Sequence, residues 1–126
     1  MDKSPGHAQH PEHKIREIQL DQRARVEAGG ENIADSIEVI KLEEDGYPPR
    51  YYFPRNDVAM DKLERSESTT HCPFKGDAHY FNVVVGGNRL KDAVWTYENP
   101  YEEHVALRNR LAFYSDKVPE IGIVIG

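Results

Sequence analysis

The sequence predicts a mainly β fold, in which about seven to nine short antiparallel strands form a small β-barrel or a pair of packed, curved sheets and one C-terminal α-helix covers an open edge. Three observations predict this class. Glycine, proline, asparagine and aspartate punctuate the chain every few residues, the runs between them are rich in β-branched and aromatic residues, and only one stretch begins with helix signals. At 126 residues the chain is one domain by size.

The N-terminal residues differ in composition from the rest of the chain. Residues 1–14 hold two prolines, one glycine and three histidines, and Met1 is their one bulky apolar side chain. Such a segment cannot bury enough apolar surface to offset the entropy that it loses on ordering. We therefore predict a flexible N-terminal tail over 1–14 and a single mainly-β domain over 15–126.

The strands are predicted from β-branched and alternating runs that lie between turn signals. In chain order they are expected at 23–28 with a return at 33–35, and at 36–42, 51–53, 58–63, 79–85, 89–97 and 121–125. The strongest β signal is the pair 79–85 and 89–97, because Gly86, Gly87 and Asn88 between them favour a tight hairpin.

A single helix is predicted over 100–112. Asn99 is a good N-cap, and Pro100 suits the first helical position, where its missing N–H leaves no helical hydrogen bond unmade. Helical periodicity then places His104 and Arg108 on the apolar face. At least one of the two must therefore meet a buried acid or a backbone carbonyl, or that face must meet another subunit.

Composition and charge exclude several classes of function. A net charge of −6 opposes a broad nucleic-acid surface, because binding to the phosphate backbone needs clustered lysine and arginine. No apolar run approaches the roughly 18 residues of a membrane helix, and the N-terminus lacks the apolar core of a signal peptide. The single cysteine excludes an internal disulfide framework and fits a reducing compartment. We expect a cytoplasmic protein without nucleic-acid or membrane partners, and a homo-oligomer stays open.

The stretch 69–76, Thr-Thr-His-Cys-Pro-Phe-Lys-Gly, gathers a thiol, an imidazole and an ammonium between elements that look ordered, as functional loops do. Cys72 is a candidate nucleophile whose pKa a nearby ammonium would lower. His71 would point to the other side of an extended chain, so His79 is the better base if the loop folds back. The alternative is a half-buried Cys72 that packs as a small hydrophobe. The candidate catalytic residues are Cys72, Lys75 and Asp77.

A metal site is the weaker interpretation of the same stretch. Cys72 could join His71, His79 and His104 around zinc, but structural zinc sites usually take two or more thiolates at short, paired spacing. We therefore expect no metal and no cofactor.

A pocket for a small anion is the second candidate site. Arg50 and Arg55 lie in one block dense in aromatic residues and proline, and Lys75 lies in another, so this acidic chain concentrates positive charge locally. If the two blocks meet in space, a guanidinium could bind a carboxylate or phosphate bidentately with the ammonium beside it. The alternative is that the three cations form structural ion pairs with Asp57, Asp61 and Asp77.

Strand periodicity indicates which side chains of 50–53 could line the anion pocket. In a strand, Arg50 and Tyr52 share one face while Tyr51 and Phe53 share the other, so one pair can line a cavity while the second enters the core. The aromatic rings around Trp95 can likewise be core residues or a platform for the ligand. The candidate ligand-binding residues are Arg50, Tyr52, Arg55, His71, His79 and Trp95.

Four blocks of the sequence carry a resemblance to a known family. They read PPRYYFPRNDV at 48–58, THCPFKGDAHY at 70–80, AVWTY at 93–97 and LAFY at 111–114. With this order and spacing the chain resembles the domain-of-unknown-function family 427, which implies a small, mostly β, single-domain prokaryotic protein. A nucleotidyltransferase label is sometimes attached to such proteins. The sequence has no glycine-rich loop followed by a strand with paired aspartates for two magnesium ions, so no catalytic residue is carried over.

Three hypotheses for the function follow. The favoured one is a domain with a pocket for a small anionic ligand, either as a binding protein or as an enzyme. The second is a protein-interaction module that uses Pro48, Pro49 and nearby aromatic residues, and flat exposed rings in place of a cavity would favour it. The third is a thiol or metal site at Cys72.

Overall fold

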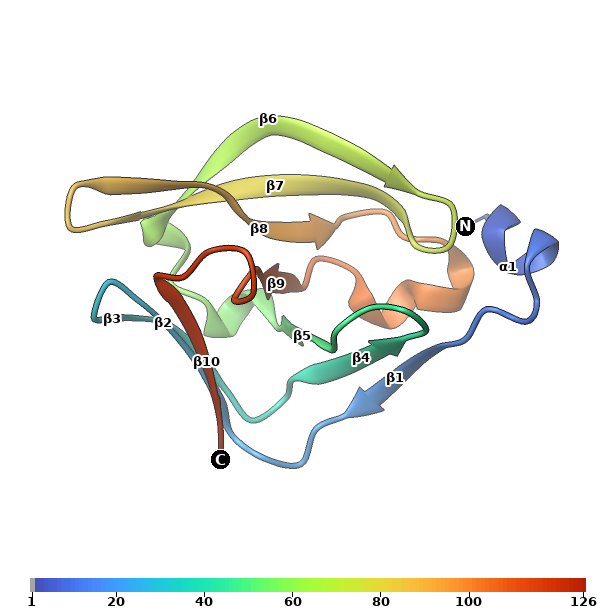
Figure 1. The fold of residues 1–126 in the computed structure, drawn as a ribbon, viewed down its shortest axis with the longest axis horizontal. Helices are drawn as coiled ribbons and strands as arrows, with labels where there is room; N and C mark the ends of the chain where they lie inside the picture. The colour runs from blue at the N-terminus through green and yellow to red at the C-terminus, as the bar shows by residue number, and fades with distance from the viewer. Residues whose placement is uncertain (1) are drawn as a thin grey trace.

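The computed structural model describes residues 2–126 as two antiparallel sheets (Figure 1). The larger sheet has seven strands in the order β1 (Ile15–Gln19), β4 (Ile40–Glu44), β5 (Arg50–Phe53), β9 (Leu111–Phe113), β8 (Asn88–Tyr97), β7 (Gly76–Val85) and β6 (Leu63–Cys72). The smaller sheet has three, in the order β10 (Ile121–Ile125), β2 (Ala24–Ala28) and β3 (Glu31–Ser36). The mainly β class is confirmed. The larger sheet ends at β1 and β6, so the predicted closed barrel is wrong and the alternative of two sheets is confirmed.

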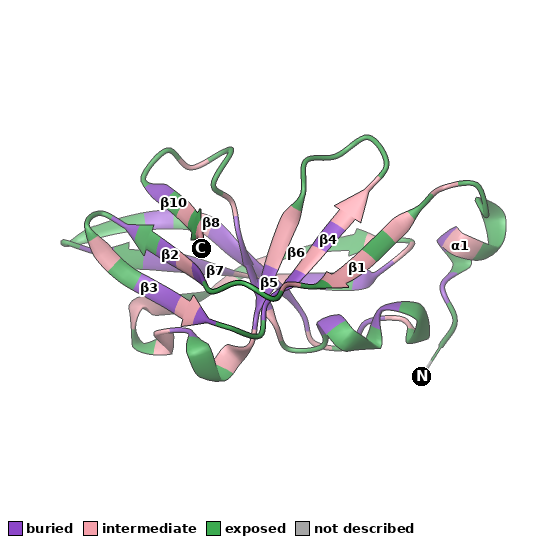
Figure 2. Ribbon diagram, turned by 90° about the horizontal axis from the view of Figure 1, so that it is seen from below, coloured by how far each residue is buried: buried purple, intermediate pink, exposed green. Residues whose placement is uncertain are grey.

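Two clusters of buried side chains lie on opposite faces of the larger sheet. The first cluster joins the two sheets and includes Val26 from β2, Phe53 from β5 and Phe113 from β9. The second cluster includes Tyr52 from β5 and Trp95 from β8. Figure 2 shows β5 with its buried residues between the smaller sheet on one side and β1 and β4 on the other. Alternation along β5 thus divides its side chains between two environments, as its period of two predicts.

The β7–β8 hairpin is the sequence prediction that agrees best with the structure. The two strands pair from Ala78 with Tyr97 to Val85 with Asn88. The turn between them consists of Gly86 and Gly87, whose φ angles of 57° and 78° match a turn type in which both central residues need positive φ. The predicted strands near β2, β3 and β10 are also found.

The predicted strand over 58–63 is wrong, and a strand that precedes β7 was missed. Residues before 63 form two short 3₁₀ turns, η1 (Arg55–Asp57) and η2 (Met60–Lys62), and β6 follows them. Polar and charged side chains dominate β6, which lies at an edge of the larger sheet. Charged residues are common on edge strands because they discourage pairing with other chains, and the same residues hide the strand from a hydrophobic pattern.

The predicted C-terminal helix is wrong. Its region holds a short 3₁₀ segment, η3 (Glu102–Leu107), which is interrupted by non-helical backbone angles at His104. The chain then turns through Asn109, whose φ is 62°, and enters β9. Strand β9 pairs with both β5 and β8, so these ladder hydrogen bonds outweigh the local helix signals. His104 is buried and does meet an acid, because its Nδ1 lies 2.7 Å from Glu17 Oε2.

The N-terminal segment has defined contacts in the structure. Met1 lies outside the described residues, and α1 (Pro5–Gln9) is capped by the Ser4 hydroxyl. The Gly6 N–H donates to the Pro73 carbonyl at 2.9 Å, and the His7 ring meets Phe74 edge to face. Flexibility of residues 1–14 in solution stays a prediction, but the docking surface at the β6–β7 turn was not visible in the sequence. None of the helices within residues 2–126 has the length and apolar character that a membrane crossing requires.

Candidate functional site

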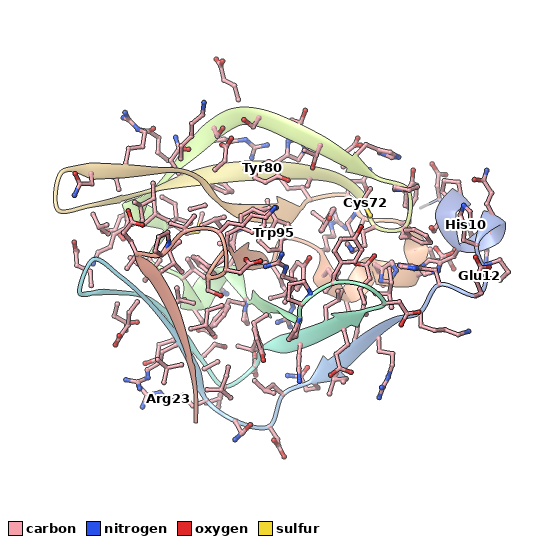
Figure 3. The ribbon with its side chains drawn as sticks, in the orientation of Figure 1. His10, Glu12, Arg23, Cys72, Tyr80 and Trp95 are labelled. Carbon is pink, nitrogen blue, oxygen red and sulfur yellow. The ribbon has the colours of Figure 1, made fainter. Side chains whose placement is uncertain are left out.

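A cavity of about 650 Å³ opens on the face of the larger sheet that carries the second cluster. Strands β4, β5 and β8, the β6–β7 turn and the segment after β9 contribute its walls. The lining is rich in rings and in paired charges, and it comprises His13, Leu42, Glu44, Tyr47, Pro48, Arg50, Tyr52, His71, Cys72, Pro73, Phe74, Lys75, Tyr80, Trp95, Tyr97, Tyr114, Asp116 and Lys117. Figure 3 shows Cys72 between Trp95 and the N-terminal segment that carries His10 and Glu12.

Arg50 is held against two aromatic rings in this cavity. Its guanidinium carbon lies 5.3 Å from the ring centre of Trp95 and 5.2 Å from that of Tyr114, and the two rings lie 4.2 Å apart, centre to centre. Arg50 Nη1 also donates to Asp116 Oδ1 at 2.7 Å. This hydrogen bond holds the pKa of the Asp116 carboxyl below its usual value. The result is a guanidinium that is held in place against two aromatic rings.

Lys75 has a different environment, although it lines the same cavity. Lys75 is only 7% exposed, and its Nζ donates to Glu44 Oε1 at 2.7 Å. Glu44 Oε2 lies 2.9 Å from His13 Nε2. Burial alone would raise the pKa of Glu44, but the hydrogen bonds from Lys75 and His13 outweigh it and lower that pKa. Lys75 is therefore neutralised by a carboxylate that the N-terminal segment also contacts.

Three phenols in the wall stay protonated over the physiological range. Burial raises the pKa of Tyr52 and of Tyr97 far above their usual values. Burial, together with Tyr80, raises the pKa of Tyr114 to about 12. Trp95 Nε1 donates to the Tyr52 hydroxyl at 3.0 Å, which fixes the indole. The wall thus consists largely of aromatic rings and neutral hydroxyls.

Cys72 lies in the cavity wall as a free, half-buried thiol. His71 next to it pairs with Asp77, with Nδ1 2.7 Å from Oδ1. His79 lies on the other face of the sheet, because Ala78 and Tyr80 on either side of it belong to the second cluster. Its Nε2 is 4.0 Å from Glu98. Within the described chain, no histidine is hydrogen-bonded to the thiol, so the structure assembles no Cys–His pair.

The candidate ligand-binding residues are divided by the sheet. The cavity brings together Arg50, Tyr52, His71, Cys72, Lys75 and Trp95. Arg55, like His79, lies on the opposite face, where its Nη2 donates to Thr96 Oγ1 at 3.2 Å. Asp77 borders a separate depression beside Tyr101. Among residues 2–126, no group of three or more histidine, cysteine or acidic side chains is arranged to hold a metal ion, and the expected lack of a metal stays a prediction.

Several residues that shape the cavity were not predicted from sequence. Asp116 and Glu44, rather than the predicted Asp57, Asp61 and Asp77, pair with Arg50 and Lys75. Tyr114 lies in one of the four blocks of the family resemblance, so that block could have indicated it. Asp116 and Lys117 follow two and three residues later and carried no pattern of their own.

Comparison with known protein families matches residues 17–122 to a family described as a domain of unknown function, DUF427. A search of curated proteins finds no match. The matched range begins within β1, ends within β10 and includes most of the cavity wall. The order and spacing of the four sequence blocks had already indicated this family. The chain belongs to the DUF427 family of domains of unknown function.

Proposed function

We propose that this domain binds a small anionic ligand that carries a flat ring, and that the ligand lies in the cavity against Trp95 and Tyr114. One observation carries the proposal: the Arg50 guanidinium is fixed against both rings inside a concave space of about 650 Å³. Cavities of about 300 to 1,000 Å³ are typical of small-molecule sites. A ring face beside a fixed guanidinium suits a planar ligand that ends in a carboxylate or phosphate.

The shape of the aromatic surface favours a small ligand over a partner chain. A protein-interaction surface would present flat, exposed rings, but here Tyr52, Trp95 and Tyr97 are buried in the wall of a cavity. Tyr47, which is 64% exposed, lies at the cavity with Pro48 beside it. The proline-containing stretch therefore contributes to the cavity wall.

The charges around the cavity favour an anion. Its lining contains three cations, Arg50, Lys75 and Lys117, and two carboxylates, Glu44 and Asp116, which leaves one net positive charge with the histidines neutral. The whole chain carries −6. A local positive balance on an acidic protein concentrates anions at that place.

Arg50 is the cation that contacts the ligand in this proposal, and Lys75 supports the wall. Lys75 is buried and already donates to Glu44. Arg50 donates one N–H to Asp116, and a guanidinium has five such donors, so further donors can serve a bound anion. Lys117 Nζ lies 4.7 Å from the centre of the Tyr114 ring and adds positive charge near the same ring.

The test uses the fluorescence of Trp95, which is the single tryptophan of the chain and lies in the cavity wall. The protein is titrated with a panel of nucleotides and aromatic carboxylates, and with inorganic phosphate and adenosine as controls that lack the ring or the charge. We expect a saturable change in Trp95 fluorescence for members that have both features, and no change for either control. A flat response to the whole panel would contradict the proposal.

Two variants make the test specific to Arg50. Arg50→Gln should weaken binding by about tenfold or more, because a charge-assisted hydrogen bond is lost. Arg89→Gln is the matched control, since Arg89 is exposed and pairs with Glu64. Equal binding by both variants, or adenosine binding as tightly as its monophosphate, would show that the cavity does not select for an anion.

A further inference from the structure

A second cationic site lies outside the cavity. Pro54, Arg55, Asn56, Arg108, Asn109 and Arg110 line a depression of about 400 Å³. Its lining holds three arginines and no carboxylate. On a chain with a net charge of −6, such a local excess of positive charge needs an explanation. The arginines come from two segments far apart in sequence, the turn after β5 and the turn before β9, so the fold itself assembles the cluster.

This depression is separate from the ligand cavity. Trp95 and Tyr97 line the cavity, so Thr96 between them points to the opposite face of β8. Arg55 reaches that opposite face, where its Nη2 donates to Thr96 Oγ1 at 3.2 Å. No residue lines both spaces. A ligand in the depression would therefore leave the surroundings of Trp95 in place.

Neutral groups hold two of the three guanidinium groups in position. Arg110 Nη1 donates to the carbonyl of Glu38 at 2.6 Å and Nε to that of Ala106 at 3.2 Å. Arg55 Nε donates to the carbonyl of Asn109 at 3.0 Å, and its Nη2 lies 3.9 Å from Glu98 Oε2. Carbonyls orient a guanidinium without cancelling its charge. The two groups are thus fixed and only weakly compensated.

The third arginine of the cluster is Arg108. Arg108 is exposed, and in the described part of the chain neither Arg108 nor Arg110 forms an ion pair, unlike Arg50, Arg65 and Arg89. Burial lowers the pKa of Arg110 below its usual value, although the nearby carboxylates of Glu38 and Asp57 act in the opposite direction. An arginine stays charged all the same, so the lining of the depression keeps three positive charges.

We infer that this depression binds the phosphate group of a small phosphorylated molecule, held by Arg55, Arg108 and Arg110. Planar guanidinium groups match the oxygens of phosphate in bidentate fashion, and several of them together select a dianion over a monoanion. Asn56 and Asn109 line the same space and are neutral. No aromatic ring lines the depression, so charge and not stacking drives binding here.

The test locates phosphate by nuclear magnetic resonance. The full chain, labelled with ¹⁵N, is titrated at low salt with inorganic phosphate and, in a second series, with ribose 5-phosphate. We expect saturable shifts of the amide signals of 54–56 and 108–110 and of the arginine Nε–H signals, with the Trp95 indole signal unchanged. If ribose 5-phosphate binds more tightly than inorganic phosphate, the site recognises a phosphate ester. If the two bind equally tightly, the site recognises free phosphate.

Variants decide whether the arginines cause these shifts. Arg108→Gln removes an exposed side chain that forms no ion pair within residues 2–126, so the variant should fold normally and weaken phosphate binding by about tenfold. Arg55→Gln should also weaken phosphate binding. Arg16→Gln is the control, because Arg16 is exposed and pairs with Glu43, and this variant should bind phosphate like the unchanged protein. Shifts that spread over the whole surface without saturating, or that persist in Arg108→Gln, would overturn the inference.

Discussion

Glu44→Gln should destabilise the fold by about 3 kcal/mol, because it leaves the buried Lys75 ammonium without a counter-charge. Lys75 and Glu44 are 2.7 Å apart, and their side chains are 9% and 11% exposed. Breaking such a buried pair by removing one partner costs about 3 to 5 kcal/mol. We take the lower end because the glutamine retains an oxygen that can accept from Lys75. With a urea m value of about 1.5 kcal/mol/M, the midpoint of unfolding should fall by about 2 M.

Unfolding in urea, followed by Trp95 fluorescence, measures this midpoint. Glu43→Gln is the matched control: Glu43 is the next residue on β4, its side chain is 38% exposed, and it pairs with Arg16 at 3.5 Å. A surface pair of this kind is worth at most about 1 kcal/mol, so the control should move the midpoint far less. Glu44→Gln combined with Lys75→Met removes both charges and should recover most of the lost stability. Equal effects of Glu44→Gln and Glu43→Gln, or a double variant as unstable as the sum of its parts, would refute this reasoning.

Three further predictions concern the N-terminal segment and the thiol. Gly6→Ala should release the N-terminal segment from the β6–β7 turn, since an ideal Cβ would lie 2.7 Å from the Pro73 carbonyl oxygen. Trypsin should then cut at Lys14 faster in this variant than in a Gln9→Ala control. Burial and the nearby His104 lower the pKa of His7, so the docked N-terminal segment favours neutral His7 and binds fewer protons than the released segment. Docking should therefore weaken as the pH falls through about 6.5, and hydrogen exchange of the Gly6 amide should become faster. Exchange that does not change with pH in this way would contradict the prediction. Cys72→Ser should stay folded within about 1 kcal/mol, and loss of the fold would show that the thiol is a core residue.

The structure also shows which local patterns were informative. The hairpin around Gly86 and Gly87 was predicted because its turn type depends on the backbone freedom of these two residues. The division of β5 into Tyr52 and Phe53 faces was predicted because strand alternation is a property of the strand itself. The helix prediction from Asn99 and Pro100 was wrong. Local start signals contain no information about the later residues of the same stretch, which pair with two strands.

The candidate site shows the same limit. The sequence indicated Arg50 and Lys75 but not which acids they meet, since Asp116 and Glu44 are 66 and 31 residues away from them. Arg55 was grouped with Arg50 by closeness in sequence, and the fold places it on the other face of the sheet.

By itself, the sequence determined the mainly β class, the family, the hairpin and the division of the β5 side chains between two faces. Each of these depends on periodicity, turn chemistry or ordered motifs, which act over a few neighbouring residues. Only the tertiary structure decided that Arg50 lies against Trp95 and Tyr114, and that Arg108 and Arg110 join Arg55 in a second depression. Those contacts join strands and turns that are distant in the chain, and the pairing order of a sheet depends on how all of its strands pack together.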